Sequence, residues 1–118
     1  MRTLPALVCA LALALAGCGS DAERRTAPAP AGDPGLRVWA AQGCGSCHTF
    51  APAGATATIG PNLSHSLAGR SRGYIRESIV APNARVPGGG TSIMPEGFAQ
   101  RMTKAELDAL VAFIARGR

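Results

Sequence analysis

The stretch GCGSCHTF, residues 43–50, carries two cysteines three positions apart and a histidine directly after the second. This is the C-x-x-C-H pattern of covalent haem attachment. Cysteines with this spacing lie on one side of a single helical turn, so both thiols can form thioethers with the two vinyl groups of one haem. The histidine then reaches the iron from the same side as an axial ligand. We therefore predict one covalent haem c, held by Cys44, Cys47 and His48.

Three other interpretations of the cysteines stay open from the residues alone. A thioredoxin-like dithiol is typical of a βαβ setting, which the surrounding sequence lacks. A disulfide between Cys44 and Cys47 would leave His48 without a role. A tetrahedral zinc site needs two further cysteine or histidine ligands, and His65 is the only other histidine. The haem interpretation is the one that uses all three residues of the motif.

A haem iron in a cytochrome has a second axial site, for which three residues are candidates. Met94 lies in TSIMPEGF, residues 91–98, after a glycine run and before a proline that stiffens the chain. Met102 directly precedes the expected cap of the last helix and should pack on Leu107 as a hydrophobic staple. His65 lies in a polar, serine-rich stretch and should face solvent. We predict Met94 as the ligand, with Met102, His65 and an open site as the alternatives.

The choice of Met94 decides the expected function. An iron held by imidazole and thioether has no free position for oxygen or substrate, and the neutral sulfur favours Fe(II) and raises the reduction potential. Such a centre exchanges one electron with little change in geometry. We therefore predict an electron-transfer protein, not an enzyme, with no catalytic residues. A labile or absent sixth ligand would instead favour a gas-binding or peroxidatic haem protein.

Three helices can be placed in the sequence, and each has a start or stop signal of its own. An N-cap aspartate followed by proline begins the first, a serine and a proline bound the second, and a capping box begins the third. The expected ranges are residues 34–43, 73–80 and 104–116. Long loops over residues 51–60 and 83–97 contain no convincing strand and need something to hold them. The predicted fold class is all-α, with three main helices and long loops wrapped around one haem.

The segment before residue 34 does not read as part of the domain. A basic start and an apolar run over residues 4–16 are typical of a signal peptide. The run ends in LAGC, which closes at Cys18 and resembles the lipobox of bacterial lipoproteins. We predict a signal peptide over residues 1–17, an acylated cysteine with a flexible Ala/Pro linker over residues 18–33, and a domain over residues 34–118. An ordinary secretory cleavage is the alternative.

This organisation predicts export and a lipid anchor on the extracytoplasmic side of a bacterial membrane. The 118-residue chain has a formal net charge of +5 and only one Trp, one Tyr and three Phe. A core this thin, without cysteines for a disulfide network, favours a large apolar cofactor.

Nucleic-acid binding is not expected, because no aromatic residues are interleaved with the basic ones. The basic excess forms either a solvated face or a surface that steers an acidic partner. Its members are Arg70, Arg72, Arg76 and Arg85.

The order of these features resembles a class I, mitochondrial-type monohaem cytochrome c, with the attachment motif first, the methionine near the end and a closing helix last. GPNLSHSLAGR, residues 60–70, is similar to the loop that follows the motif in that family. The resemblance implies that the Pro61 carbonyl accepts the other ring N–H of His48 and makes this ligand more electron-rich. It also implies that the first and last helices cross near right angles, with Gly43 permitting their close approach.

YIRESIVAPNARV and MPEGF resemble the cytochrome c domain fused to subunit II of some haem–copper oxidases. The sequence has neither the binuclear copper motif nor the membrane helices of that subunit, so we expect a free-standing, lipid-anchored version. The resemblance implies a monomeric one-electron carrier that serves membrane respiratory complexes. A haem subunit fixed in a dehydrogenase or oxidase complex is the alternative. Arg70 and Tyr74 are candidates for hydrogen bonds to the haem propionates, and Arg72 is expected to be more exposed.

Overall fold

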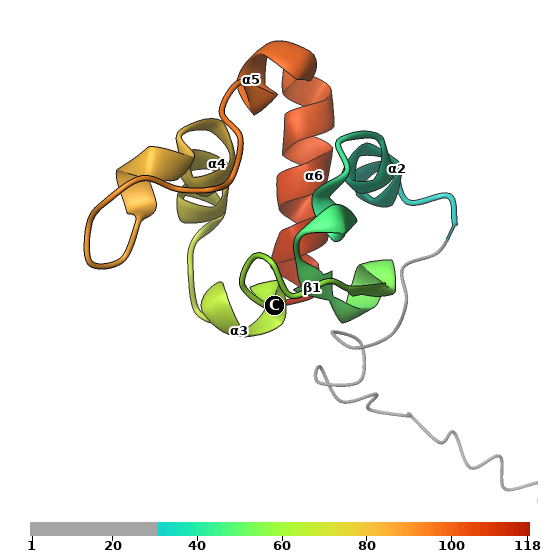
Figure 1. The fold of residues 1–118 in the computed structure, drawn as a ribbon. Coiled ribbons are helices and arrows are strands. Elements are labelled where there is room, and N and C mark those ends of the chain that lie inside the picture. Colours follow the sequence, from blue (N-terminus) through green and yellow to red (C-terminus); the bar gives the residue numbers. More distant parts are fainter. Residues whose placement is uncertain (1–30) are drawn as a thin grey trace, which may run out of the picture.

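The computed structural model describes residues 31–118, so the predicted signal peptide, Cys18 and most of the linker lie outside the described residues. Three longer helices form the frame of the domain: α2 (Pro34–Ala41), α4 (Arg72–Val80) and α6 (Lys104–Arg116). Helix α6 stands between the other two, which pack on opposite sides of it (Figure 1). The three helices expected from the sequence are present, and the all-α fold class is confirmed. Within the described range, no helix has the length and apolarity needed to cross a membrane.

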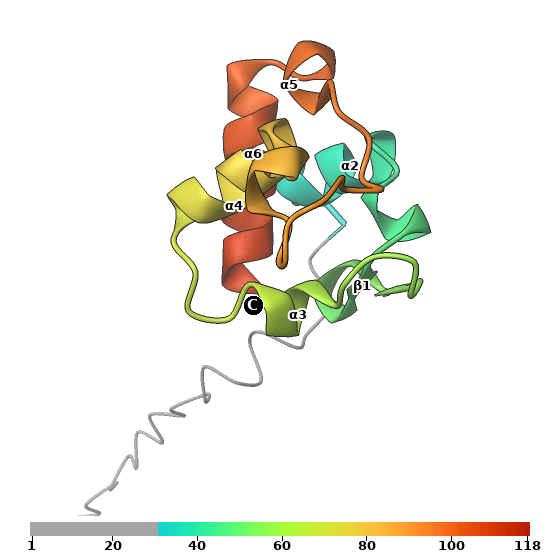
Figure 2. The same cartoon turned by 60° about the vertical axis from the view of Figure 1, so that its left-hand side comes forward.

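Shorter elements join the frame and carry the loops. They are η1 (Cys44–Ser46), β1 (Thr49–Phe50), η2 (Ala51–Ala53), β2 (Ala55–Thr56), α3 (Leu63–Ser66), η3 (Pro82–Arg85) and α5 (Phe98–Arg101). Strands β1 and β2 pair antiparallel, with Phe50 opposite Ala55. Figure 2 shows α3 and β1 at one end of α6 and α5 at the other. The sequence does not predict the pairing of β1 with β2 or the short helices α3 and α5, because each element is too short to show a hydrophobic period.

Helix α2 begins and packs for reasons that its residues make plain. The Asp33 side chain accepts the backbone N–H groups of Gly35 at 2.8 Å and Leu36 at 3.2 Å. Pro34 occupies the first helical position, as the N-cap expected from the sequence requires. A Cβ atom at Gly35 would lie 2.3 Å from Phe113 Cβ, so glycine is needed for α2 to approach α6.

The resemblance implied that Gly43 permits the close approach of α2 and α6. This prediction is wrong, because Gly35 is the glycine at the contact. Gly43 follows α2 with a φ of 70°, and a Cβ atom there would meet only Ser46 Oγ, at 3.7 Å. This left-handed conformation strongly favours glycine. Gly43 thus turns the chain from α2 into the cysteine segment, while a glycine inside α2 makes room for α6.

Helix α6 begins with the capping box that the sequence predicts. Thr103 Oγ1 accepts the Glu106 N–H at 3.2 Å, and the Glu106 carboxylate accepts the Thr103 N–H at 2.7 Å. In the last turn, Arg116 forms an ion pair with the aspartate that caps α2. Gly117 ends the helix with a φ of −99°, and a Cβ atom there would lie 2.4 Å from the Phe50 ring. Lack of space, and not backbone freedom, requires this glycine.

The core lies between the three helices and contains an aromatic cluster of Trp39, Phe50 and Phe113. The Trp39 and Phe50 ring centroids are 5.3 Å apart, and Phe113 meets both rings edge-on, at 6.2 Å and 5.5 Å. Such pairs contribute about 0.5–1.5 kcal/mol beyond area burial. An ion pair between Arg76 and Asp108 joins α4 to α6. The buried apolar side chains are Val38, Trp39, Phe50, Leu63, Leu67, Ile75, Ile79, Phe98, Met102, Leu107, Leu110, Val111, Phe113 and Ile114.

Candidate haem site

The two cysteines and the histidine share one turn. The Cys44 carbonyl accepts the backbone N–H groups of Cys47 at 3.3 Å and His48 at 3.1 Å. Both thiols are free and half-buried. A Cβ atom at Gly45 would lie 3.2 Å from Trp39 Nε1, so this turn packs directly on the aromatic cluster. The helical frame therefore fixes the backbone from which both thiols and the imidazole project.

The surroundings of Cys44 argue against a redox-active dithiol. Burial raises the pKa of the Cys44 thiol to about 11; a backbone hydrogen bond opposes this rise, and the neighbouring Cys47 adds to it. Reactive dithiols need the opposite shift, because the thiolate is the attacking species. Cys44 is suited instead to a thioether, in which the sulfur carries no charge.

A metal site made of protein side chains alone is not formed by the described residues. Across residues 31–118, no group of three or more His, Cys, Asp or Glu side chains is placed to hold a metal ion. A structural zinc site needs four such ligands around one point. The zinc interpretation of the cysteines therefore has no support in the geometry.

His48 is oriented by the loop that passes over it. Its Nδ1 lies 2.9 Å from the Pro61 carbonyl oxygen. Because a carbonyl only accepts, Nδ1 carries the proton in this contact, and Nε2 keeps its lone pair for a metal. The hydrogen bond implied by the resemblance is therefore present, while the ligation of iron by His48 stays a prediction.

Gly60 is a residue of the site that the sequence analysis missed. Its N–H donates to the Cys47 carbonyl at 2.7 Å, which ties this loop to the cysteine turn. A Cβ atom at Gly60 would lie 2.7 Å from His48 Cε1 and 2.8 Å from His48 Nδ1. Only glycine lets the backbone pass so close to the imidazole. The signal in the sequence is the Gly-Pro pair, which is equally typical of a plain bend.

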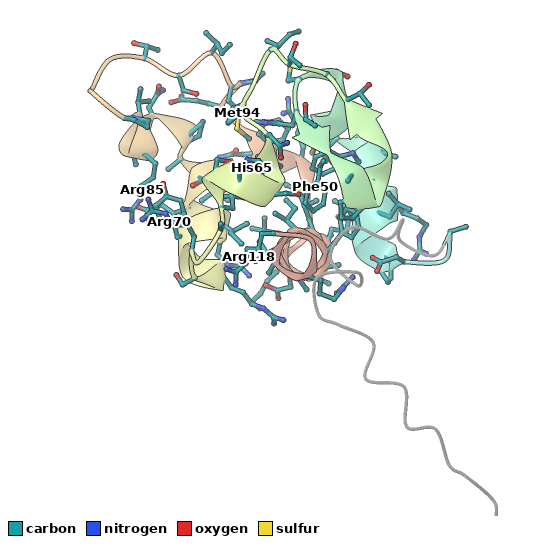
Figure 3. The ribbon with its side chains drawn as sticks, turned by 90° about the horizontal axis from the view of Figure 1, so that it is seen from below. Phe50, His65, Arg70, Arg85, Met94 and Arg118 are labelled. Carbon is teal, nitrogen blue, oxygen red and sulfur yellow. The ribbon has the colours of Figure 1, made fainter. Side chains whose placement is uncertain are left out.

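Met94 is the residue predicted as the second axial ligand. It is half-buried and packs against the same core as Cys44. In Figure 3 its side chain points from its loop toward the middle of the domain. Met102 is 9% exposed and belongs to the core, where the sequence places it as a packing residue. His65 is exposed on α3. Ligation by Met94 stays a prediction.

Arg70 and Tyr74, the candidates for propionate contacts, lie against each other. The guanidinium carbons of Arg70 and Arg85 are 4.8 Å and 4.9 Å from the centre of the Tyr74 ring. Figure 3 shows the two arginines beside each other at one edge of the domain, apart from Met94. Arg85 also pairs with Glu77. Stacking on the ring accounts for both positions, so propionate contacts stay a prediction.

The described residues fit a covalently attached haem. Two free thiols project from one turn, an imidazole offers Nε2, and a thioether packs on the same core. The large apolar side chains exposed within the described range are Ile59, at 66%, and Ile93, at 78%. Ile59 precedes the loop over His48 and Ile93 precedes Met94, so each of these exposed apolar side chains is adjacent in the chain to a segment of the candidate site. A haem offers apolar faces to such side chains.

Comparison with known proteins gives one match. The family model described as Cytochrome c matches residues 32–117. The matched range includes the cysteine turn, the loop over His48 and the segment that carries Met94. Neither the curated proteins nor the solved structures give a significant match.

Proposed function

Because the chain belongs to the cytochrome c family, we propose that it is a one-electron carrier whose haem iron is held between His48 and Met94. The family carries covalently attached haem c, for which Cys44 and Cys47 form the attachment pair. The observation that carries the proposal is the contact between His48 Nδ1 and the Pro61 carbonyl, because it leaves Nε2 to ligate. The haem supplies the one-electron chemistry when bound, and the chain supplies attachment, axial ligands and exclusion of other ligands.

The residues favour electron transfer over bond making. Cys44 and Cys47 would hold the haem through thioether bonds in both oxidation states. The hydrogen bond to Pro61 makes the His48 imidazole a better electron donor. The neutral sulfur of Met94 would be the second iron ligand, which would raise the reduction potential and keep small ligands out.

The visible spectrum of the purified oxidised protein tests the ligation. We expect a sulfur-to-iron charge-transfer band, and Met94→Ala should abolish it. Met102→Ala is the matched control, since it removes the other methionine sulfur of the domain from the core. It should keep the band and lower the free energy of unfolding by about 2–4 kcal/mol. A band that survives in Met94→Ala would show that another residue ligates the iron.

A gas-binding or peroxidatic haem protein is the second candidate, and one observation favours it. Among residues 31–118, no backbone–backbone hydrogen bond involves residues 90–96, so side-chain contacts alone hold the segment that carries Met94. A ligand on such a segment can be displaced. Rapid binding of carbon monoxide by the reduced native protein would support this candidate, whereas slow binding supports the carrier.

The lipid anchor also belongs to the proposal. Its support is the LAGC motif ending at Cys18, followed by a linker rich in Ala and Pro. An anchor on the extracytoplasmic side of a bacterial membrane raises the effective concentration of the carrier near membrane-bound partners. Cys18→Ser should move the protein out of the membrane fraction, and Cys9→Ser, within the predicted signal peptide, should not. Retention of Cys18→Ser in the membrane would count against acylation.

The partners in this proposal are membrane respiratory complexes, on the support of the resemblance to oxidase subunit II domains. The basic face contributes less to steering than the sequence suggests, because Arg76 pairs with Asp108 and Arg85 pairs with Glu77. Among the described residues, Arg70 and Arg72 form no ion pair. Co-purification after mild detergent extraction distinguishes a subunit fixed in a dehydrogenase or oxidase complex from a mobile carrier.

A further inference from the structure

The loop between η3 and α5 carries Met94, and one side chain forms hydrogen bonds to this loop on both sides of the methionine. Asn83, in η3, accepts the Ser92 N–H at 2.7 Å through Oδ1. Its Nδ2 donates to the Glu96 carboxylate. Ser92 lies two residues before Met94 and Glu96 two residues after it, so the Asn83 amide holds the ends of a five-residue segment with the methionine at its centre.

Ser92 carries the contact onward to the methionine itself. The Ser92 hydroxyl accepts the Met94 N–H at 3.0 Å. The connection therefore runs from η3 through the Asn83 amide to Ser92, and from the Ser92 hydroxyl to the Met94 backbone. A turn stabilised in this way fixes the direction in which the Met94 side chain leaves the chain.

Other features of the loop do not provide such a hold. Gly88, Gly89 and Gly90 have φ values of 78°, 78° and 103°, and a Cβ atom at any of them would meet nothing within 4 Å. They shape the loop without packing it. Ile93 is 78% exposed and does not anchor the segment in the core. As noted above, residues 90–96 also form no backbone–backbone hydrogen bond within the described range.

We propose that Asn83 is the positioning residue for the axial methionine, its amide holding the loop closed over the site so that the Met94 sulfur stays on the iron. The inference rests on the proposed ligation by His48 and Met94. It assigns to η3 a role in ligand retention, because the 3-10 turn is the platform from which the amide reaches the loop.

The chemistry of the side chain explains why asparagine suits this position. Its carbonyl oxygen accepts the Ser92 N–H, and its NH2 group donates to the Glu96 carboxylate. Aspartate has the same size and keeps the first contact, but it places a second carboxylate against Glu96. The double variant Asn83→Asp/Glu96→Gln exchanges the two roles. The glutamine amide at position 96 can then donate to the aspartate carboxylate at position 83, and the Ser92 N–H keeps a carboxylate oxygen at position 83 as its acceptor.

The test is the rate at which added imidazole displaces the Met94 sulfur in the oxidised holoprotein, followed through the sulfur-to-iron band. Displacement requires the loop to open, so the rate reports how firmly it is held. We expect Asn83→Asp and Asn83→Ala to raise the rate about tenfold, because each loses the hydrogen bond to the Glu96 carboxylate, which is exposed to solvent. The double variant Asn83→Asp/Glu96→Gln should return to within about twofold of the wild type.

Gln100→Glu is the control for added charge, because it makes the same amide-to-carboxylate change on the exposed face of α5; its rate should equal that of the wild type. Asn83 variants that exchange at the wild-type rate would overturn the inference, and so would a double variant as labile as Asn83→Asp. If Met94→Ala keeps the band, the proposed ligation fails instead. If only the Asn83 variants lack an effect, the ligation stands and the positioning role does not.

Discussion

The two sides of the haem site are held by different kinds of contact. On the cysteine side, backbone hydrogen bonds from Cys47 and His48 to Cys44, and from Gly60 to Cys47, close the turn over a packed aromatic cluster. On the methionine side, residues 90–96 depend on the Asn83 amide and on partial burial of the methionine. We therefore expect the cysteine side to stay fixed while the methionine side opens first.

This difference has a physical consequence for function. Segments with few backbone hydrogen bonds and exposed side chains open at low free-energy cost, well below that of global unfolding. The attachment side keeps the haem in place in every state of the folded protein. If Met94 ligates the iron as proposed, each opening of the methionine side would expose an axial position, and this side would determine whether the iron only exchanges electrons or also binds other ligands. Mutations on the two sides should thus affect different measurements.

The largest effect is expected in the frame under the cysteine side. Gly35→Ala places a Cβ atom 2.3 Å from Phe113 Cβ and 2.4 Å from the Ala109 carbonyl oxygen, so α2 must move away from α6. We expect a loss of about 3 kcal/mol in the free energy of unfolding, measured by denaturant titration of the holoprotein.

Gly73→Ala is the matched control for this prediction. A Cβ atom at Gly73, in α4, would meet only Ser71 Oγ, at 3.7 Å. The substitution should therefore leave stability unchanged or raise it by up to about 1 kcal/mol, because alanine has the higher helix propensity. Equal stability of Gly35→Ala and Gly73→Ala would show that the cysteine side does not depend on the close contact of α2 and α6.

The next effect is expected at the imidazole. Gly60→Ala should tilt the His48 ring away from the Pro61 carbonyl, since the new Cβ atom would lie 2.7 Å from Cε1. We expect a destabilisation of about 1–3 kcal/mol. A higher reduction potential should accompany it, because the imidazole becomes a poorer donor to Fe(III). Pro61→Ala is the control, since it keeps the backbone carbonyl; a potential that shifts equally in both variants would contradict the role of the hydrogen bond.

Local signals in the sequence were sufficient to predict the frame. Asp33 before proline and the Thr103–Glu106 capping box each act within one helical turn, so the residues that make the contact are neighbours in the chain. The cysteine motif is equally local, and its turn has the predicted form. The glycine that admits α6 was assigned wrongly, because only the packed arrangement shows that Gly35, and not Gly43, faces the other helix.

The methionine side shows why the rest could not be predicted. Asn83 and Ser92 are nine residues apart, and most of the chain between them is an irregular loop after η3, so no periodic pattern marks their contact. Stacking of Arg85 on Tyr74 is a contact of the same kind, set by the return of η3 onto α4. Such contacts depend on loop conformation, which composition limits but does not determine.

A smaller effect is expected in the glycine run of the methionine loop. Gly89→Ala puts a side chain at a φ of 78° in open space, so the cost is backbone strain alone. We expect a strain of about 1 kcal/mol in the folded state, seen as faster displacement of the axial sulfur by imidazole together with an equally small loss in the free energy of global unfolding. Gly32→Ala, also in open space but without a positive φ, should change neither. A loss confined to global unfolding would contradict the separation of the two sides.

The smallest effect is expected from acid at the start of α6. Hydrogen bonds from the backbone and side chain of Thr103 lower the pKa of Glu106, and ion pairing with Lys104 and Arg76 lowers the pKa of Asp108. A carboxylate whose pKa is lowered by folding stabilises the folded state at every pH above the pKa that it has in the unfolded chain. This stabilisation is lost as the pH falls through the lowered pKa of the folded state.

Glu106→Gln removes the charge of the capping side chain and keeps its length, because glutamine can still accept the Thr103 N–H across the same turn. At neutral pH the variant should melt slightly below the wild type, as it lacks a negative charge in the first turn of α6. Below about pH 5 the wild type loses this advantage as the carboxylate is protonated, so the two melting temperatures should converge. Asp108 remains in both proteins and keeps a common acid dependence. The measurement is thermal unfolding by far-UV circular dichroism from neutral pH to about pH 3.5. A gap that stays constant in acid would mean that the capping box depends on hydrogen-bond geometry and not on charge, and that Glu106 is not an acid-sensitive contact at this helix start.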